Sequence, residues 1–445
     1  MKLLIKNAKI ITMNENLDII DGSIIVENNI ISEIVLGCIN EKIHSNFDEI
    51  IEAEGKIVAP GFINTHSHLG MVGFRSLVDG IKNRLKTIFF PFEQNFMNRN
   101  LVYNSAKVGC IEMLQNGITT VVDMYYFEDE IAKAVEEVGI RGFLGPSVVN
   151  FNVCDMKGNE EDFELIEEFI KKYQNHNLIK PIIAPHSIYQ NSIESLKKSF
   201  ELANKYDTNW TMHLSEMDFE ISELKEKHNL TPIGFLAKNN LLNERLIAAH
   251  CVIVTDEDID LLKKYNVNVS HCPISNAKSG RLVAPIIKML DKGVNVCLGT
   301  DGPSSLNALD LFEVIKMTGY IHKCVNRDTT AMSSVDLIKM ATINAAKALN
   351  KENEIGSIEV GKKADMMILE TDSPNMIPIF DVYSLLAYSA CSKNIDTVIV
   401  DGKILVKSGK IQNHDMKKVK NDFNVSMIDF SKQANDELKK LGIIK

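Results

Sequence analysis

Residues 56–68 read KIVAPGFINTHSH, an apolar run that ends in two histidines one residue apart. A short apolar run of this kind is consistent with a buried strand. Side chains two residues apart in a strand point to the same side, so His66 and His68 can both reach one ligand from a single strand end. The segment therefore predicts a strand that presents two metal-type side chains where it ends.

Three more residues of this kind close later apolar runs. His213 ends NWTMH, His250 ends RLIAAH and Asp301 ends VNVCLGTD. Imidazole nitrogen and carboxylate oxygen are usual ligands of zinc, and a site with three His and one Asp leaves room for a water molecule. An HxH pair alone is a weak signal in a chain with 11 histidines, but its recurrence with other ligand types at strand ends predicts a metal site.

Eight β-rich runs recur along the chain at spacings that leave room for helices. They are residues 56–68, 117–124, 141–149, 179–187, 208–216, 245–252, 266–273 and 294–302. The segments between them have helical periodicity, and several end in Gly or Asn, which often stop helices. Strand and helix alternating eight times predict an α/β fold with a (β/α)8 TIM barrel over residues 56–356. The metal-type residues then lie at the C-terminal strand ends, where barrel active sites are found.

Both ends of the chain alternate short strands with turns. This pattern covers residues 1–55 and residues 357–412, and each flank alone has too few strands for independent stability. We therefore predict one small β-sandwich domain assembled from both ends. Residues 413–445 are charged and helix-like, which predicts a C-terminal helical tail packed on a surface.

The composition indicates which partners to expect. The 445 residues include 59 acidic and 49 basic side chains, a net charge of -10 that disfavours binding to nucleic acid or anionic lipid. No segment has the length of a membrane helix, and the N-terminus lacks the apolar length of a signal peptide. The cysteines show no CxxC spacing and are interpreted as small buried residues in a reducing cytosol: Cys38, Cys110, Cys154, Cys251, Cys272, Cys297, Cys324 and Cys391. We expect a soluble, cytoplasmic homo-oligomer with a small-molecule heterocyclic substrate and no nucleic-acid or membrane partner.

A series of motifs, taken in order, resembles the amidohydrolase superfamily in its methylthioadenosine/S-adenosylhomocysteine deaminase-like branch. The motifs are APGFINTHSH, GITTVVDM, APHSIY, TMHLSE, AAHCV, SHCPISNAKSG, LGTDGPSS and GSIEVGKKADMMIL. The resemblance covers nearly the whole chain and is more specific for the superfamily than for the substrate.

The resemblance implies a site for one divalent metal ion, with zinc favoured and iron as the alternative. Its ligands would be His66, His68, His213 and Asp301. The fourth strand run ends in Ala184-Pro185-His186-Ser187 and offers no lysine to bridge a second ion, so the implied site is mononuclear.

The resemblance also assigns catalytic and substrate-binding residues. Glu216, three residues beyond His213, would carry protons and contact the substrate. His250 would polarise or orient the attacking water, and Asp301 could accept its proton as well as bind metal, so the roles of these two can interchange. Further substrate contacts are implied for Glu93, to ribose hydroxyls, and for His186 and Ser305.

Two features depart from the branch that the sequence resembles. Relatives that accept S-adenosylhomocysteine carry an arginine at the end of the third strand, whereas residues 142–147 read GFLGPS. They also supply a tryptophan from the lid, but KNRLKTIFFPFE has none, and Phe89 or Phe90 would take its place. Trp210 is expected to point outward from its strand into the core between strand and helix. The cations that could still hold a carboxylate from a loop are Lys82, Arg84 and Lys157.

These features favour a metal-dependent aminohydrolase that releases ammonia from an adenosine-type nucleoside without a carboxylate tail, such as methylthioadenosine, 5'-deoxyadenosine or adenosine. One alternative keeps the site but changes the ring or the bond, as in guanine, pterin or s-triazine deaminases and chlorohydrolases. Glu216 favours deamination because a departing amine needs a proton. A non-catalytic metal-binding scaffold is a further alternative, and it would require lost ligands.

Overall fold

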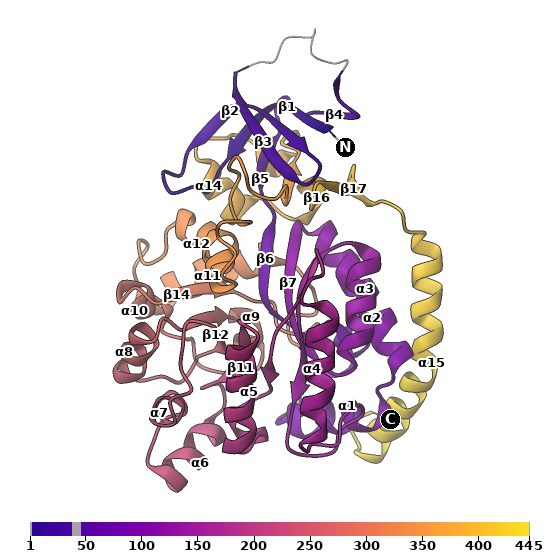
Figure 1. Ribbon diagram of the computed structural model, residues 1–445, viewed down its shortest axis with the longest axis vertical. Helices are drawn as coiled ribbons and strands as arrows, with labels where there is room; N and C mark the ends of the chain where they lie inside the picture. The colour runs from indigo at the N-terminus through magenta and orange to yellow at the C-terminus, as the bar shows by residue number, and fades with distance from the viewer. Residues whose placement is uncertain (1, 38–45, 445) are drawn as a thin grey trace.

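A barrel of parallel strands forms the larger part of the computed structural model, which describes residues 2–37 and 46–444 (Figure 1). Its strands are β6 (Phe62–Ser67), β7 (Ile118–Tyr125), β8 (Arg141–Val148), β9 (Ile179–Pro181), β10 (Ala184–Pro185), β11 (Trp210–Leu214), β12 (Leu246–His250), β13 (Asn268–His271) and β14 (Asn295–Leu298). They form a five-stranded and a four-stranded sheet in which neighbours along the chain pair in parallel. Because β9 and β10 together occupy the fourth position, the predicted eight-stranded barrel is confirmed.

The two parallel sheets join where their strands end. Ser187, just beyond β10, forms a bridge with His213 of β11. On the other side, the amide nitrogen Nδ2 of Asn64 in β6 donates to the hydroxyl of Thr300 at 2.8 Å, and the backbone N–H of Thr300 donates to Oδ1 of Asn64 at 3.0 Å. Residues at or next to the predicted ligands therefore link the two sheets.

Helices surround the barrel (Figure 1). They are α1 (Phe90–Phe96), α2 (Arg99–Gln115), α3 (Glu128–Val138), α4 (Glu161–Tyr173), α5 (Ile193–Lys205), α6 (Asp218–His228), α7 (Pro232–Lys238), α8 (Asp256–Lys264), α9 (Pro273–Lys278), α10 (Ile286–Asp291), α11 (Leu311–Asn326), α12 (Ser334–Ala341) and α13 (Ile343–Ala348). Several begin at a capping side chain; the hydroxyl of Thr255, for example, accepts from the backbone N–H of Asp258 at 3.1 Å to start α8. As the sequence predicts, Trp210 is fully buried, and its ring meets Phe200 of α5 at 5.7 Å.

Strands from both ends of the chain form a mixed sheet, which contains parallel and antiparallel pairs. From the N-terminal side come β1 (Lys2–Ile11), β2 (Ile19–Glu27), β3 (Ile30–Leu36), β4 (Glu49–Glu52) and β5 (Ile57–Pro60); from the C-terminal side come β15 (Met366–Leu369), β16 (Ile395–Val400), β17 (Lys403–Lys407) and β18 (Lys410–Ile411). Strand β5 pairs with both β1 and β15, which joins the two sets. Strands from both chain ends thus form one mixed sheet, as the sequence predicts, and its assignment as a β-sandwich domain separate from the barrel stays a prediction.

The first predicted strand, residues 56–68, is wrong in one respect, because it divides at Gly61 between the two sheets. Strand β5 belongs to the mixed sheet and β6 to the barrel. A Cβ atom on Gly61 would lie 2.1 Å from the side chain of Thr119, so only glycine fits where the chain passes from one sheet to the other.

The mixed sheet contacts the N-terminal end of the barrel. Arg141, the first residue of β8, is buried and donates from Nε to Asp365 at 2.7 Å and from Nη2 to Asp401 at 3.3 Å. These carboxylates border β15 and β16. The C-terminal strand ends, which carry the predicted ligands, therefore remain open on the other side of the barrel.

The last helix, α15 (Met416–Lys440), runs along the outside of the barrel beside α2 (Figure 1). Its Phe430 is buried against Phe74 with ring centroids 5.0 Å apart. Two short helices, α14 (Val382–Ser384) and a π-helix over Leu385–Ser389, precede the last sheet strands.

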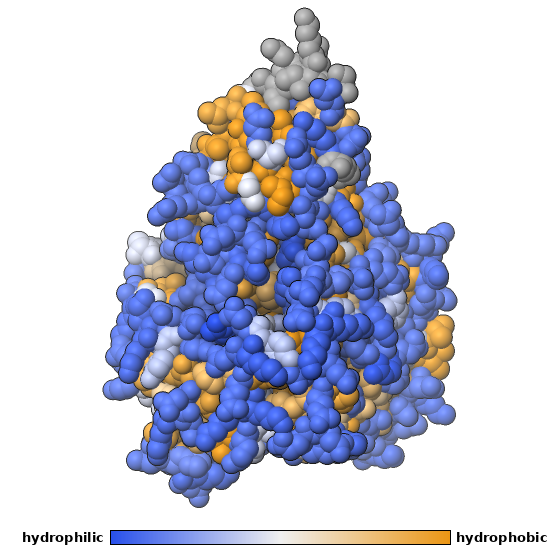
Figure 2. All heavy atoms as spheres, viewed as in Figure 1, coloured by the Kyte–Doolittle hydropathy of each residue, from blue (hydrophilic) through white to orange (hydrophobic). Residues whose placement is uncertain are grey.

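Figure 2 shows a mostly hydrophilic face over the barrel and an apolar area over β2 and β3, where Ile19 and Leu36 are exposed. No helix in the described ranges is both long and apolar enough to cross a bilayer. The described cysteines are all free; most are buried or partly buried, but Cys324 is exposed on α11, which corrects the expectation that all are buried. Cys38 lies outside the described residues.

Candidate metal and catalytic site

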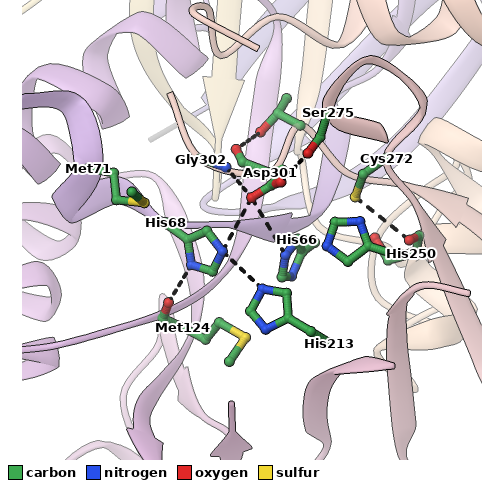
Figure 3. A network of polar contacts seen from close by, with 12 residues as sticks. His66, His68, Met71, Met124, His213, His250, Cys272, Ser275, Asp301 and Gly302 are labelled. Atoms are coloured by element: carbon green, nitrogen blue, oxygen red, sulfur yellow. Dashed lines mark hydrogen bonds and ion pairs between the residues drawn. The ribbon is translucent and has the colours of Figure 1, made fainter. Parts of the chain in front are cut away.

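Three predicted ligands meet at the C-terminal ends of β6 and β11. The ligand atoms of His66, His68 and His213 lie within 4.8 Å of one another, and the Nε2 atoms of His68 and His213 are 3.3 Å apart. Figure 3 shows these imidazoles pointing toward a common centre beside Asp301. The first strand and the fifth, far apart in sequence, are brought together by closure of the barrel.

The hydrogen bonds of the histidines indicate what belongs at that centre. Nδ1 of His68 is 2.7 Å from the carbonyl oxygen of Met124, and Nδ1 of His213 is 2.8 Å from that of His186. A carbonyl only accepts, so each Nδ1 carries a proton and each Nε2 faces the common centre. Two Nε2 atoms 3.3 Å apart favour a proton or another cation between them.

His66 adds a second observation. Both of its ring nitrogens are buried and have no hydrogen-bond partner among the described residues, although buried polar atoms normally have one. Burial, together with the neighbouring His213 and His68, holds the pKa of His66 well below its usual value. The ring is therefore neutral, which is the form that binds a metal.

Asp301 supplies negative charge to the same centre. Its Oδ1 is 3.3 Å from Nε2 of His68 and accepts from the backbone N–H of Gly302 at 2.6 Å, and its other oxygen accepts from Ser275. Burial lowers the pKa of His68, but Asp301 raises it more, to about 9. Since this arrangement favours a proton or another cation at Nε2, the donor set fits a divalent metal ion.

The backbone at three strand ends adopts the left-handed conformation. Ser215, His250 and Asp301 have φ angles of 52°, 75° and 60°, which are uncommon for residues with a side chain. Such conformations cost free energy and are concentrated at functional sites. Here they occur beyond β11, at the end of β12 and beyond β14, at or next to Glu216, His250 and Asp301.

His250 lies beside the histidine cluster and is fully buried. Its ring stacks on that of His213 with centroids 5.5 Å apart. Nδ1 is 3.0 Å from Oδ1 of Asn276, so Nδ1 is the protonated nitrogen. Nε2 has no hydrogen-bond partner among the described residues and can accept a hydrogen bond from a water molecule.

Glu216 follows β11 and faces His250. Its Oε1 is 3.5 Å from Nε2 of His250 and forms an ion pair with Arg281. Burial raises the pKa of Glu216, but His250, Arg281 and His213 outweigh it, so the pKa lies below its usual value. The carboxylate is therefore ionised at neutral pH and is suited to accept a proton.

The site opens into a cavity of about 1090 Å³. Its wall includes all the residues predicted to contact substrate: Glu93, His186, Glu216 and Ser305. Phe89 and Phe90, the suggested replacements for the lid tryptophan, also line it. Burial raises the pKa of Glu93 to about 7, although Tyr125 and His68 beside it lower the value. The structure thus brings together the residues to which the sequence motifs assign roles, and those roles stay predictions.

The cavity also shows which cations can reach a substrate. The third barrel strand contributes Ser147 where relatives would have an arginine. Lys82 and Arg84 line the cavity, whereas Lys157 is exposed and pairs with Glu161. Arg281 lines it as well and was missed from sequence, because it stands just outside the SHCPISNAKSG motif.

Comparison with known proteins identifies the group to which the chain belongs. The pattern that defines the amidohydrolase family matches residues 57–405. The chain is a member of the amidohydrolase family. Its predicted class, a hydrolase that acts on carbon–nitrogen bonds, is confirmed with it.

Three proteins show how close the similarity is. This amidohydrolase is 40% identical over 424 residues to 5-methylthioadenosine/S-adenosylhomocysteine deaminase of Thermoanaerobacter pseudethanolicus, covering 94% of this chain and 97% of the relative. It is 36% identical over 438 residues to 5'-deoxyadenosine deaminase of Methanosarcina acetivorans, covering 97% and 99%. The crystal structure of an adenosine deaminase from Xanthomonas campestris with bound zinc superimposes with a TM-score of 0.92 at 25% identity, covering 97% and 98%.

Proposed function

We propose that this amidohydrolase is a metal-dependent deaminase that replaces the amino group of an adenosine-type nucleoside with an oxo group and releases ammonia. The observation that carries the proposal is the placement of a buried, ionised Glu216 beside the histidine cluster, at the wall of a cavity large enough for a nucleoside. The deaminase names of the relatives and of the zinc-containing structure support it.

We propose that His66, His68, His213 and Asp301 hold one divalent ion, zinc rather than iron. When bound, the ion supplies a Lewis acid that lowers the pKa of water toward 7. The short Nε2 contact and the unpartnered ring of His66 support this ligand set. We expect elemental analysis of metal-loaded protein to give about one ion per chain, and two tightly bound ions would contradict the mononuclear site.

The protein side chains then have distinct tasks in deamination. His250 accepts a hydrogen bond from water at Nε2 and orients an oxygen lone pair toward the ring carbon that bears the amine. As the C–O bond forms, Glu216 takes the proton of the water and delivers it to the adjacent ring nitrogen. When the C–N bond breaks, the second proton of the water leaves with the amine as ammonia, and the ring carbon becomes a carbonyl. In the alternative that the sequence leaves open, Asp301 accepts the first proton of the water while His250 orients it, or the two residues exchange these roles.

An ammonia-release assay tests the proposed function. Metal-loaded protein is incubated with purine nucleosides, free purines, pyrimidines, pterins and s-triazines, and ammonia is measured with each. We expect the highest kcat/KM with 5'-deoxyadenosine, methylthioadenosine or adenosine. If ammonia is released only from another ring, the substrate is a different heterocycle but the reaction is still a deamination. If none of the compounds releases ammonia, the proposed deamination is wrong.

We predict that S-adenosylhomocysteine is not preferred over methylthioadenosine or 5'-deoxyadenosine. A site without a carboxylate anchor gains nothing from the tail and must still desolvate it, and the third strand offers only Ser147 to the cavity. The measurement is kcat/KM for the three nucleosides. A preference for S-adenosylhomocysteine of more than about tenfold, or about 1.4 kcal/mol, would contradict it, and its loss in Arg84→Met would identify Arg84 as the anchor.

We further propose that the protein is cytoplasmic. The absence of disulfides among the described cysteines is consistent with a cytoplasmic location. We propose a homo-oligomer, which light scattering of the purified protein can test. The exposed Ile19 and Leu36 on neighbouring strands β2 and β3 support a contact between copies.

A further inference from the structure

The Glu216 carboxylate has two oxygens in different environments. Oε1 forms an ion pair with the guanidinium of Arg281 and lies 3.5 Å from His250. The Arg281 hydrogen bond goes to Oε1, and no described donor is placed on Oε2. The two oxygens are therefore not equivalent, and Arg281 determines which of them remains available.

Arg281 is held in this position through the same helix that orients His250. Its backbone N–H donates to the carbonyl of Asn276 at 2.9 Å, and the Asn276 side chain contacts Nδ1 of His250 at 3.0 Å. Asn276 lies on α9, and its own N–H donates to Cys272 at 3.1 Å. A closed ring of four residues results: His250, Glu216, Arg281 and Asn276.

Burial strengthens this arrangement. The side chains of Arg281 and Glu216 are 19% and 6% exposed, so the charge-assisted hydrogen bond between them is shielded from bulk water, where such pairs contribute little. A free glutamate side chain samples several rotamers. The guanidinium favours the rotamer in which Oε1 is engaged, which leaves Oε2 as the oxygen free to exchange a proton.

We propose that Arg281 is a positioning residue that binds Oε1 of Glu216 and thereby presents Oε2 for proton transfer. This inference rests on the proposed function, since it assumes that Glu216 carries the proton. Arg281 acts through Glu216 and contributes to turnover without having to contact the nucleoside. Its role is distinct from that of a carboxylate anchor, which would bind one end of the substrate.

A double-mutant cycle tests the proposal. Arg281→Met removes the guanidinium and retains much of the side-chain length. We expect kcat to fall about tenfold, the loss of one charge-assisted hydrogen bond, with KM little changed. The same substitution in a Glu216→Gln background should cause no further loss, because the residue through which Arg281 acts no longer transfers a proton. Arg281→Lys, which keeps a cationic donor, should restore part of kcat.

Arg245→Met is the matched control. Arg245 also pairs with carboxylates, those of Asp207 and Glu244, and its side chain is 25% exposed. It precedes β12 at the opposite end of the barrel, so we expect its kcat to equal that of the wild type. Metal content and Tm are measured for every variant, and Arg281→Gln serves as the neutral substitution if Arg281→Met does not fold.

Three outcomes would overturn the proposal. An equal loss of kcat in both backgrounds would indicate a general structural role. A rise in KM alone, with kcat unchanged, would make Arg281 a substrate-binding residue. If neither kcat nor KM changes in Arg281→Met, Arg281 has no role in the reaction. The proposed function fails separately: a Glu216→Gln variant as active as wild type would contradict the assignment of Glu216 whatever Arg281 does.

Discussion

Glu216→Gln should retain about one metal ion per chain and lose on the order of 10²- to 10⁴-fold in kcat, the range for removing a general acid or base. Glutamine has nearly the same size and can still hydrogen-bond, but it cannot carry the proton from water to the ring. The residue lies outside the cluster of ligand nitrogens, so we expect the metal content not to change. Ammonia release measures the loss of turnover, and elemental analysis measures the metal content per chain.

Glu223→Gln is the control for this substitution. Glu223 lies on α6, is 49% exposed and pairs with Lys227, so its kcat should equal that of the wild type. The prediction fails if Glu216→Gln is nearly as active as the wild type, because deamination would then use another proton carrier. It also fails if the variant loses its metal, since the loss of activity would then have a different cause.

The barrel and the histidine cluster could be predicted because strand ends are visible in the sequence. Each apolar run ends where its strand reaches the C-terminal face, and β6, β11 and β12 end at or next to His66, His213 and His250. Closure of parallel strands then brings these ends together whatever their separation along the chain. Position at a strand end, rather than any single motif, carried the prediction.

The division of residues 56–68 was not predictable in the same way. Both halves are apolar and of strand type, and periodicity does not distinguish one strand from two. The break depends on the contact of Gly61 with Thr119, which lies more than fifty positions further along the chain. A glycine after a proline within an apolar run is the one local signal that could have indicated it.

The ion pair between Glu216 and Arg281 could not be predicted from the sequence either. The two residues are 65 positions apart, and Arg281 lies on a connection between α9 and α10 rather than at a strand end. The backbone N–H of Arg281 donates to the carbonyl of Asn276, which helps to hold this loop beside Glu216. The backbone acceptors that fix the tautomers of His68 and His213 likewise have no signal in residue type, since every residue has a carbonyl.

His66→Ala should lower the metal content well below one ion per chain and reduce kcat on the order of 10³-fold or more, because the metal contributes several kcal/mol to catalysis. His66 is 1% exposed, and neither of its ring nitrogens has a hydrogen-bond partner among the described residues. Its ring therefore has no hydrogen-bonding role in the fold that could account for the loss. Chelation of the wild type should have the same effect, and added zinc should restore the wild type but not the variant.

His271→Asn separates the loss of a ligand from the loss of a buried histidine. His271 also ends a barrel strand, β13, and is 1% exposed, but its Nε2 pairs with His322 at 3.1 Å instead of joining the ligand cluster. We expect this variant to keep about one ion per chain even if its Tm falls. If His66→Ala bound the ion as tightly as the wild type, or if His271→Asn lost it, the ligand set would be misassigned, because metal affinity depends on the number of donors that meet at one point.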